Sequence, residues 1–259
     1  MKPPHVPPSL LPLVADSAWT PIGVGESRAD VYRLDWPGRI AFLKVFACLP
    51  GCGAACRAGE RLDWLRGRLS VPQVLGYAAE DGREYLLLSA IPGIDTSSET
   101  LGMENLDVVR LLAQGLRMVH EVPIRDCPFD MTLDRVLPQT ERNVRLGLVD
   151  EDEFDPERAS GSPEELFQVL RSSRPATEDL VFTHGDYCLP NILVDDGEIS
   201  GFVDMGRAGV ADRYKDIALA VGSIRRNCGD AFVQPFLDEY GGLDSNAEKI
   251  EYYLLLDEF

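Results

Sequence analysis

The segment at residues 184–191 limits the possible folds and functions of this chain more than any other; its sequence is His-Gly-Asp-Tyr-Cys-Leu-Pro-Asn. Asp186 and Asn191 are five positions apart, and Asp204 follows thirteen positions later, after the apolar run Gly201-Phe202-Val203. An aspartate can accept a hydroxyl proton, while an amide oxygen and a second carboxylate are hard ligands that suit Mg²⁺. The order and spacing are those of a kinase-type phosphoryl-transfer site. A surface turn capped by Asp and Asn is the alternative.

A lysine upstream supports the first interpretation. Lys44 stands in the middle of an apolar run, residues 39–46, that predicts a β-strand. It is costly there unless its ammonium meets an anion, or unless the strand is an edge strand and the side chain points to solvent. The loop Gly23-Val24-Gly25 precedes it between β-type runs, and such a loop can lay backbone N–H groups over phosphates. Together these features predict kinase-like nucleotide chemistry.

Composition narrows the class of partner. The chain has 259 residues, enough for one large domain or two lobes, and a formal net charge of -18. Such a charge disfavours binding to nucleic acid or an anionic membrane and favours cationic partners, although solubility alone could explain it. No apolar run is long enough to cross a membrane, and the proline-broken N-terminus does not resemble a signal peptide, so we expect a cytoplasmic protein.

The cysteines raise the question of a metal site. Cys48, Cys52 and Cys56 repeat every four residues and could align on a helix as zinc ligands. However, Gly51 and Gly53 disfavour a continuous helix, and no nearby histidine supplies a fourth ligand. We therefore expect reduced thiols.

Periodicity predicts strands early and helices late. Residues 18–46 predict strands and hairpins, and residues 70–77 and 84–89 predict two strands with a hairpin turn at Asp81-Gly82. A helix is expected over residues 55–67. After Ile91-Pro92-Gly93, helical patterns dominate. The expected helices cover 106–119 (with an apolar stripe at Leu106, Val109, Leu112, Leu116 and Val119), 133–148, a stretch from Ser162-Pro163, 212–226, 229–240 and 246–258.

Over nearly its whole length the chain resembles the aminoglycoside 3′-phosphotransferases, or kanamycin kinases, of the protein-kinase-like superfamily. The resemblance is carried by Gly25-Glu26-Ser27, Val31-Tyr32-Arg33-Leu34, Cys127-Pro128-Phe129-Asp130, Gly147-Leu148-Val149-Asp150, Thr183-His184-Gly185-Asp186, Gly201-Phe202-Val203-Asp204, residues 206–213 and Leu255-Leu256-Asp257-Glu258-Phe259. It implies ATP-dependent phosphorylation of the 3′-hydroxyl of these antibiotics, and hence resistance.

The expected fold class is α+β, with the two lobes of a protein kinase. Residues 1–90 would form a small sheet-rich N-lobe that covers the nucleotide, and residues 91–95 a hinge. Residues 96–259 would form a larger, mainly helical C-lobe with the catalytic loop and the aminoglycoside-binding helices. Because the strands cluster early, an alternating doubly wound fold fits poorly.

The resemblance also implies roles for individual residues on the nucleotide side. Asp186 would orient or deprotonate the acceptor hydroxyl, and Arg207 would lie near the transferring phosphoryl group. Asn191 and Asp204 would hold Mg²⁺. The expected nucleotide is ATP, with GTP as the alternative. The residues expected to contact it are Lys44 at the α and β phosphates, the backbone near Ser27 at the β phosphate, Phe42 stacked on the base or simply in the core, and Ser89 and Ile91 at the polar edge of the base.

On the acceptor side, the resemblance points to acidic residues that would bind the ammonium groups of the drug. Those residues are Glu153, Asp155, Asp257, Glu258 and the terminal carboxylate of Phe259; solvated surface acids are the alternative for the loop acids. The expected partners are a cationic aminoglycoside and a nucleoside triphosphate, with no nucleic acid and no membrane. The protein is expected to be a monomer or a weak homodimer.

The chain departs from the family pattern at Ala58, where the family carries a glutamate that pairs with the strand lysine. Glu60 is the nearest acid and the candidate partner of Lys44, although it faces another side of a helix. Ser223, Arg225 and Arg226 stand where the family often has acids. The alternative functions are therefore a kinase of another small alcohol, such as a macrolide, and a catalytically silent nucleotide-binding protein.

Overall fold

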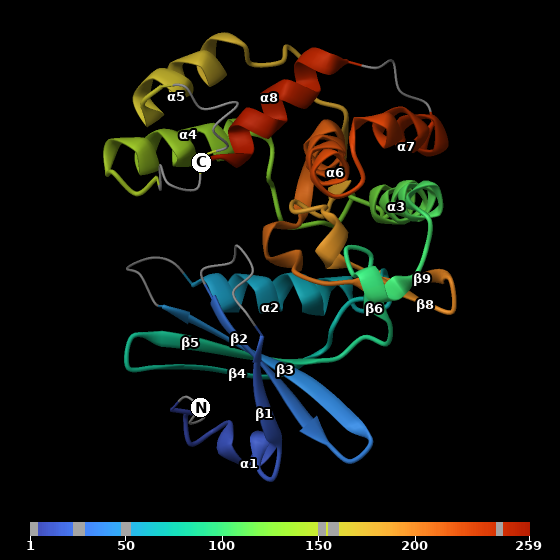
Figure 1. The fold of residues 1–259 in the computed structure, drawn as a ribbon. Helices are drawn as coiled ribbons and strands as arrows, with labels where there is room; N and C mark the ends of the chain where they lie inside the picture. Colours follow the sequence, from blue (N-terminus) through green and yellow to red (C-terminus); the bar gives the residue numbers. More distant parts are fainter. Residues whose placement is uncertain (1–4, 23–28, 48–52, 150–153, 155–160, 242–245) are drawn as a thin grey trace. The chain divides into compact units, whose positions relative to one another are not determined.

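The computed structural model describes residues 5–22, 29–47, 53–149, 154, 161–241 and 246–259. The chain forms two compact units (Figure 1). The first comprises Met1–Gly93, Leu193–Asp196 and Ser200–Arg207, and the second comprises Ile94–Ile192, Gly197–Ile199 and Ala208–Phe259.

The first unit is built on a five-stranded antiparallel sheet with the strand order β1-β2-β3-β5-β4. Asp81 and Gly82, at the turn between β4 and β5, have φ angles of 49° and 72°. Two consecutive positive φ angles are what a tight hairpin turn requires, so the turn expected there is confirmed. The elements are α1 (Leu11–Val14), β1 (Ala18–Ile22), β2 (Ala29–Trp36), β3 (Arg39–Ala47), α2 (Ala54–Leu65), β4 (Val74–Glu80) and β5 (Arg83–Ser89).

The side chains of strand β3 alternate between the two faces of the sheet. Ala41, Leu43 and Val45 are buried in a core that includes residues of the N-terminal segment. Because side chains alternate along a strand, Lys44 lies on the opposite face, where its partner in β5 is Leu86. Helix α2 covers this second face (Figure 1). A Cβ placed on Gly59 of this helix would lie 3.6 Å from the Leu86 side chain. Lys44 is thus held on a half-buried, helix-covered face of a central strand and is not an edge-strand lysine.

A buried carboxylate that the sequence did not single out ties α2 to the sheet. Glu84 in β5 is only 3% exposed. Its Oε2 accepts a hydrogen bond from the backbone N–H of Ala55 at 3.3 Å, and its Oε1 accepts one from the hydroxyl of Tyr77 at 2.9 Å. The first amides of a helix have no partner within the helix, and its N-terminus favours negative charge. Glu84 therefore acts as an N-terminal anchor for α2.

We expect Glu84→Ala to lower the free energy of unfolding by about 2–4 kcal/mol, because it leaves the buried N–H of Ala55 without its acceptor and also removes the acceptor of the Tyr77 hydroxyl. Tyr77→Phe removes only one of the two hydrogen bonds and should cost about 1 kcal/mol. Urea unfolding of both variants beside the wild type measures the difference. Equal stability of Glu84→Ala and the wild type would contradict the anchoring role.

The second unit is mainly helical, and α6 lies at its centre against α3, α7 and α8 (Figure 1). Residues 214–224 of α6 are all buried. Helix α5 begins with a capping box in which Ser162 and Glu165 satisfy each other's backbone N–H groups. The helices are α3 (Asn105–His120), α4 (Leu133–Arg145), α5 (Pro163–Ser172), α6 (Tyr214–Asn227), α7 (Val233–Tyr240) and α8 (Ala247–Asp257).

Short strands and single helical turns connect these helices. Strands β7 and β10 pair antiparallel and flank the segment of the His-Gly-Asp motif. The strands are β6 (Ile94–Asp95), β7 (Leu180–Thr183), β8 (Ile192–Asp195), β9 (Glu198–Phe202) and β10 (Gly209–Asp212), and the 3₁₀ turns are η1 (Glu99–Leu101), η3 (Leu189–Asn191), η4 (Met205–Arg207) and η5 (Asp230–Phe232). The expected α+β class is confirmed.

Some expected boundaries were wrong. Helix α1 was not anticipated, and the strand expected from Ser70 begins only at Val74. Helix α4 ends at Arg145 rather than Leu148, because Gly147 adopts a φ of 62° that ends a right-handed helix. None of the helices within the described residues combines the length and the apolarity that crossing a bilayer needs.

Candidate active site

The loop after β7 is held by a buried carboxylate from another helix. Asp216, in the first turn of α6, accepts hydrogen bonds from the backbone N–H of His184 at 2.6 Å and of Gly185 at 2.8 Å. Gly185 has a φ of 84°, a left-handed conformation that glycine adopts without strain. Sequence reasoning missed Asp216, although an acid in an otherwise apolar helix is a signal of a buried polar role.

Asp216 is completely buried, yet it stays ionised. Burial alone would raise the pKa of its carboxyl group, but the hydrogen bonds from His120 and from the Gly185 N–H, together with the nearby His184, outweigh it, so the pKa lies below its ordinary value. A charged acceptor makes the hydrogen bonds to the loop stronger than a neutral one would.

Asp186 and Asn191 are brought together within this loop. The Asn191 Nδ2 group donates to the backbone oxygen of Asp186 at 2.9 Å and to its Oδ2 at 3.0 Å. The donation fixes the Asp186 carboxylate and leaves the amide oxygen of Asn191 available for another ligand. Cys188 lies beside them, with its Sγ 3.2 Å from the same Nδ2.

Further anchors hold the rest of the loop. The buried hydroxyl of Tyr187 donates to the backbone oxygen of Leu112 at 2.7 Å, and burial raises its pKa well above the ordinary value. The backbone N–H of Leu189 donates to Ser223 Oγ at 3.1 Å. Ser223, one of the departures from the family pattern, therefore has a structural task in this chain.

A second cluster lies in the first unit. Lys44 Nζ and Asp204 Oδ2 form an ion pair at 2.9 Å, with side chains 17% and 35% exposed. Asp204 has a φ of 62°, which is uncommon for a residue other than glycine and marks a position worth attention in a functional site. The expected strand lysine and the expected metal-binding aspartate are thus in direct contact.

The structure does not pair Lys44 with Glu60. Within the described residues, no ion pair joins these two side chains, and the Glu60 carboxylate lies 3.9 Å from the thiol of Cys56. Ala58 instead faces the Asp204 segment, because a Cβ placed on Gly206 would lie 3.7 Å from the Ala58 Cβ. The acidic partner of Lys44 in this structure is Asp204.

Phe42, Ser89 and Ile91, which are also expected at the nucleotide, belong to the first unit. Phe42 shares a sheet face with Lys44 and is half-buried. Ser89 Oγ accepts a hydrogen bond from the Gln73 backbone N–H at 2.9 Å, and Ile91 packs near Gly201. Arg207 is exposed at the end of η4. Ser27 lies outside the described residues.

The expected acceptor residues at the C-terminus are held by aromatic contacts. Asp257 ends α8, and it, Glu258 and Phe259 are half-buried. The Phe259 ring lies 5.8 Å from the Phe154 ring and 6.3 Å from the Phe167 ring, measured between centroids. Glu153 and Asp155 lie outside the described residues, but Phe154 stands between them in the sequence.

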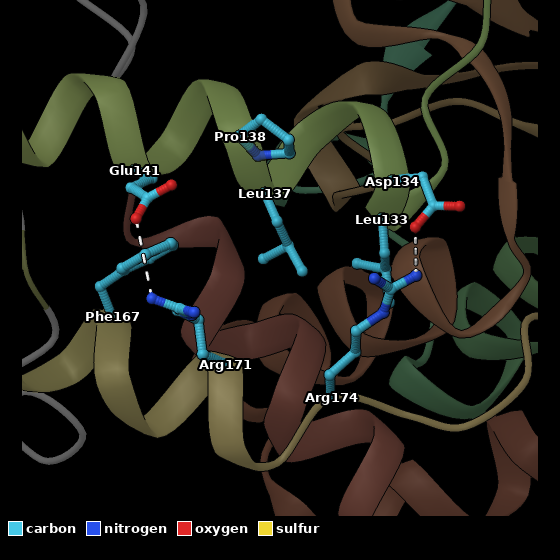
Figure 2. Close-up of a pocket in the computed structure, with 8 residues that line it drawn as sticks. All are labelled: Leu133, Asp134, Leu137, Pro138, Glu141, Phe167, Arg171 and Arg174. Atoms are coloured by element: carbon cyan, nitrogen blue, oxygen red, sulfur yellow. Dashed lines mark hydrogen bonds and ion pairs between the residues drawn. The ribbon is translucent and has the colours of Figure 1, made fainter.

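A groove of about 310 Å³ lies between α4 and α5 (Figure 2). Arg174 pairs with Asp134 at 2.6 Å, and Arg171 with Glu141 at 3.7 Å. Since each acid along the groove is matched by an arginine, the groove lacks the excess of negative charge that a polyamine would require.

No structural zinc site is found in the part of the chain that the structure describes. Cys56, Cys127, Cys188 and Cys228 form no disulfide there. Among those residues, no group of three or more His, Cys, Asp or Glu side chains could hold a metal ion. Cys48 and Cys52 lie outside the described residues.

Comparison with known proteins identifies the class of this fold and site. The model of the phosphotransferase enzyme family matches residues 18–253. The chain belongs to this family.

Individual relatives are more specific. An aminoglycoside 3′-phosphotransferase of Niallia circulans is 43% identical over 257 residues, covering 98% of this chain and 97% of the relative. The crystal structure of an aminoglycoside-3′-phosphotransferase of type VIII has a TM-score of 0.85 at 35% identity and covers 96% of both chains. APH(3″)-Id from Streptomyces rimosus, solved with ADP and streptomycin, has a TM-score of 0.79 at 28% identity, covering 96% of this chain and 95% of that one. The expected two-lobe, kinase-like fold is confirmed.

Proposed function

We propose that the protein is an ATP-dependent aminoglycoside 3′-phosphotransferase that confers resistance to these antibiotics. The similarity to the Niallia circulans enzyme carries the proposal, because it spans 97% of that enzyme and is the strongest of the similarities described above. The paired Asp186 and Asn191 and the paired Lys44 and Asp204 supply the polar groups that phosphoryl transfer needs.

Asp186 is the group that orients the acceptor hydroxyl and takes its proton. A carboxylate can do this only if it is fixed within hydrogen-bond reach of the hydroxyl, and the two hydrogen bonds from Asn191 supply that fixation. Lys44 binds the α and β phosphates, and Arg207 stabilises charge at the transferring phosphoryl group. The half-buried ring of Phe42 stacks on the nucleotide base, the chain at Ser89 and Ile91 meets its polar edge, and the backbone near Ser27 covers the β phosphate.

Mg²⁺ fits the oxygen groups of this chain. The Asn191 amide oxygen is left available, and Asp204 carries a carboxylate that now pairs with a cation. These two residues would hold the ion, which neutralises phosphate charge when bound. Since ATP and Mg²⁺ are present in the cytoplasm, we place the protein there.

The acceptor is a polycation, and its ammonium groups bind the carboxylates of Glu153, Asp155, Asp257, Glu258 and the C-terminus. The contact between Phe154 and Phe259 supports this assignment, because it joins the acidic segment around residue 154 to the acidic C-terminus. Phosphoryl transfer from ATP to the hydroxyl leaves a phosphate monoester dianion on the drug, which would weaken the drug's attraction to RNA.

The direct test is ADP release by the purified protein with ATP and Mg²⁺, in the presence of kanamycin or a 3′-deoxy analogue of kanamycin. Turnover with kanamycin and none with the analogue is expected, because the analogue keeps the charges but lacks the acceptor hydroxyl. A macrolide and choline serve as controls that carry at most one positive charge. Turnover with a macrolide but not with kanamycin would replace the proposal with the other small-alcohol kinase.

A second candidate is phosphorylation of the 3″-hydroxyl of streptomycin. The observation in its favour is the TM-score of 0.79 to the streptomycin complex of APH(3″)-Id. The same assay with streptomycin separates the two, and we expect kanamycin to be the better substrate because the 3′-phosphotransferases are the more similar proteins.

We expect Glu258→Gln to raise the aminoglycoside KM about tenfold, because it removes a charged acceptor from ammonium groups that stay charged throughout the reaction. The KM for ATP should be unchanged. Deletion of Phe259 should act in the same direction, since it also removes the ring that contacts Phe154 and Phe167. Glu251→Gln, an exposed acid on the same helix, is the matched control. A drug KM that is the same in all three variants would separate the C-terminus from the substrate.

A further inference from the structure

A buried hydrogen-bonded path leads from α7 to the loop that carries Asp186. His120, at the end of α3, lies between two partners: its Nε2 is 3.2 Å from Asp216 Oδ2, and its Nδ1 is 2.8 Å from the Tyr240 hydroxyl. The His120 side chain is only 4% exposed. Arg213 continues the path by donating from Nη1 to the same hydroxyl at 3.0 Å.

One arrangement of hydrogens satisfies every group on this path. Asp216 accepts from the loop and can only accept again, so His120 donates to it through Nε2–H. The Nδ1 atom is then an acceptor, and the Tyr240 hydroxyl donates to it while accepting from Arg213. Burial raises the pKa of Tyr240, so its hydroxyl keeps the proton that this arrangement needs. Tyr240 therefore determines which nitrogen of His120 faces Asp216 as a donor.

Asp216 connects the hydrogen-bonded path to the loop that carries Asp186, the proposed base. Its two oxygens accept the backbone N–H groups of His184 and Gly185, the residues immediately before Asp186. A rotation of the Asp216 carboxylate would move these amides and with them the base. The Nε2–H of His120 is a side-chain donor to this carboxylate, and it limits that rotation.

We propose that His120 is a positioning residue for phosphoryl transfer, oriented by Tyr240 and acting through the Asp216 carboxylate on the loop that carries Asp186. His120 touches neither substrate nor nucleotide in this role, which rests on the proposed function. It sets the direction of the base and thus kcat, rather than the affinity for either substrate.

The competing explanation is that His120 only packs α3 against α7. A different residue already performs that docking: Arg117, one turn earlier on α3, donates to the backbone oxygens of Glu239 and Tyr240 and pairs with the Glu239 carboxylate at 3.4 Å. Arg117→Ala is therefore the matched control, because it weakens the contact between α3 and α7 while keeping the Asp216, His120 and Tyr240 side chains that form the path.

Two substitutions at His120 test the roles of its two ring nitrogens separately. The amide nitrogen of glutamine can take the place of Nε2, so His120→Gln keeps the donor to Asp216. Asparagine reaches only the Nδ1 position, so His120→Asn keeps the acceptor for Tyr240 and loses the donor. We expect His120→Asn to lower kcat with kanamycin at least tenfold with both KM values within twofold of wild type, and His120→Gln and Arg117→Ala to stay within threefold.

A second measurement does not depend on the substrate. Amide hydrogen exchange of the peptide over residues 181–191 should be at least tenfold faster in His120→Asn than in the wild type, and unchanged in His120→Gln and Arg117→Ala. Tyr240→Phe removes the donor to His120 from the α7 side and should speed the same exchange to a smaller degree. This variant serves if His120→Asn does not fold.

The kinetic and hydrogen-exchange measurements distinguish failure of the proposed function from failure of the positioning role of His120. Wild-type protein that does not phosphorylate kanamycin refutes the proposed function, while the exchange data still test the positioning of the loop. Wild-type exchange in both His120→Asn and Tyr240→Phe overturns the inference. So does an equal loss of kcat in His120→Asn, His120→Gln and Arg117→Ala, because that pattern indicates packing alone.

Discussion

Asp186→Asn is expected to lower kcat for kanamycin by about 10²–10⁴-fold, the usual contribution of a positioned acid or base. The amide has the shape of the carboxylate and can still accept the hydrogen bond from Asn191, so the loop should keep its conformation. It cannot take up the proton of the acceptor hydroxyl. Steady-state kinetics of ADP release measures the loss, and the affinity for Mg²⁺–ATP, measured by calorimetry, should remain within threefold of wild type.

Asp126→Asn is the matched control, because Asp126 is an exposed aspartate of the same unit, and it should have wild-type kinetics. An Asp186→Asn enzyme with more than a tenth of the wild-type kcat would show that another group accepts the proton. Lost nucleotide binding in this variant would instead show that Asp186 acts at the nucleotide.

Asp204→Asn should have the other large effect, on the nucleotide side. The substitution removes the charge of a proposed metal ligand and the partner of Lys44, so two interactions with the triphosphate are disturbed together. Since metal stabilisation of phosphate charge contributes several kcal/mol, we expect kcat/KM for ATP to fall at least about 100-fold. The Mg²⁺ concentration for half-maximal activity should rise, which a magnesium titration measures.

Backbone strain must be separated from loss of the carboxylate. Asp204 has a φ of 62°, and Asp196 in the same unit has a φ of 48°. Asparagine tolerates this conformation as well as aspartate does. Asp196→Asn should therefore leave both kcat/KM and the magnesium dependence unchanged. An unaltered magnesium dependence in Asp204→Asn would remove Asp204 from the metal site.

The sequence predicted the architecture where local pattern decides structure. The alternation of Ala41, Leu43 and Val45 against Lys44 follows from the period of a strand, and the apolar periodicity of α3 follows from the period of a helix. The turn at Asp81-Gly82 was found from its residue types alone. Helix α1 was missed because four residues carry too little periodicity to be recognised.

The candidate site was predictable only where its residues are close in the sequence. Asp186 and Asn191 lie in one loop, so their spacing reveals the pair. His120 and Asp216 act on this loop from distant helices, and Glu84 anchors α2 from a strand 29 positions away in sequence. Such contacts depend on tertiary packing, which a single sequence does not show. The partner of Lys44 was open for the same reason, since Glu60 was chosen by proximity along the chain whereas the structure pairs Lys44 with Asp204.

The central claim is that this protein transfers the γ-phosphoryl group of ATP to the 3′-hydroxyl of an aminoglycoside. The most direct measurement is the position of the phosphate in the product, read from phosphorus–proton correlation NMR of kanamycin after complete turnover. The account predicts a single phosphorus signal coupled to the proton on carbon 3′. A phosphorus signal coupled to any other ring proton, or unmodified kanamycin after incubation with protein that binds ATP, would contradict it.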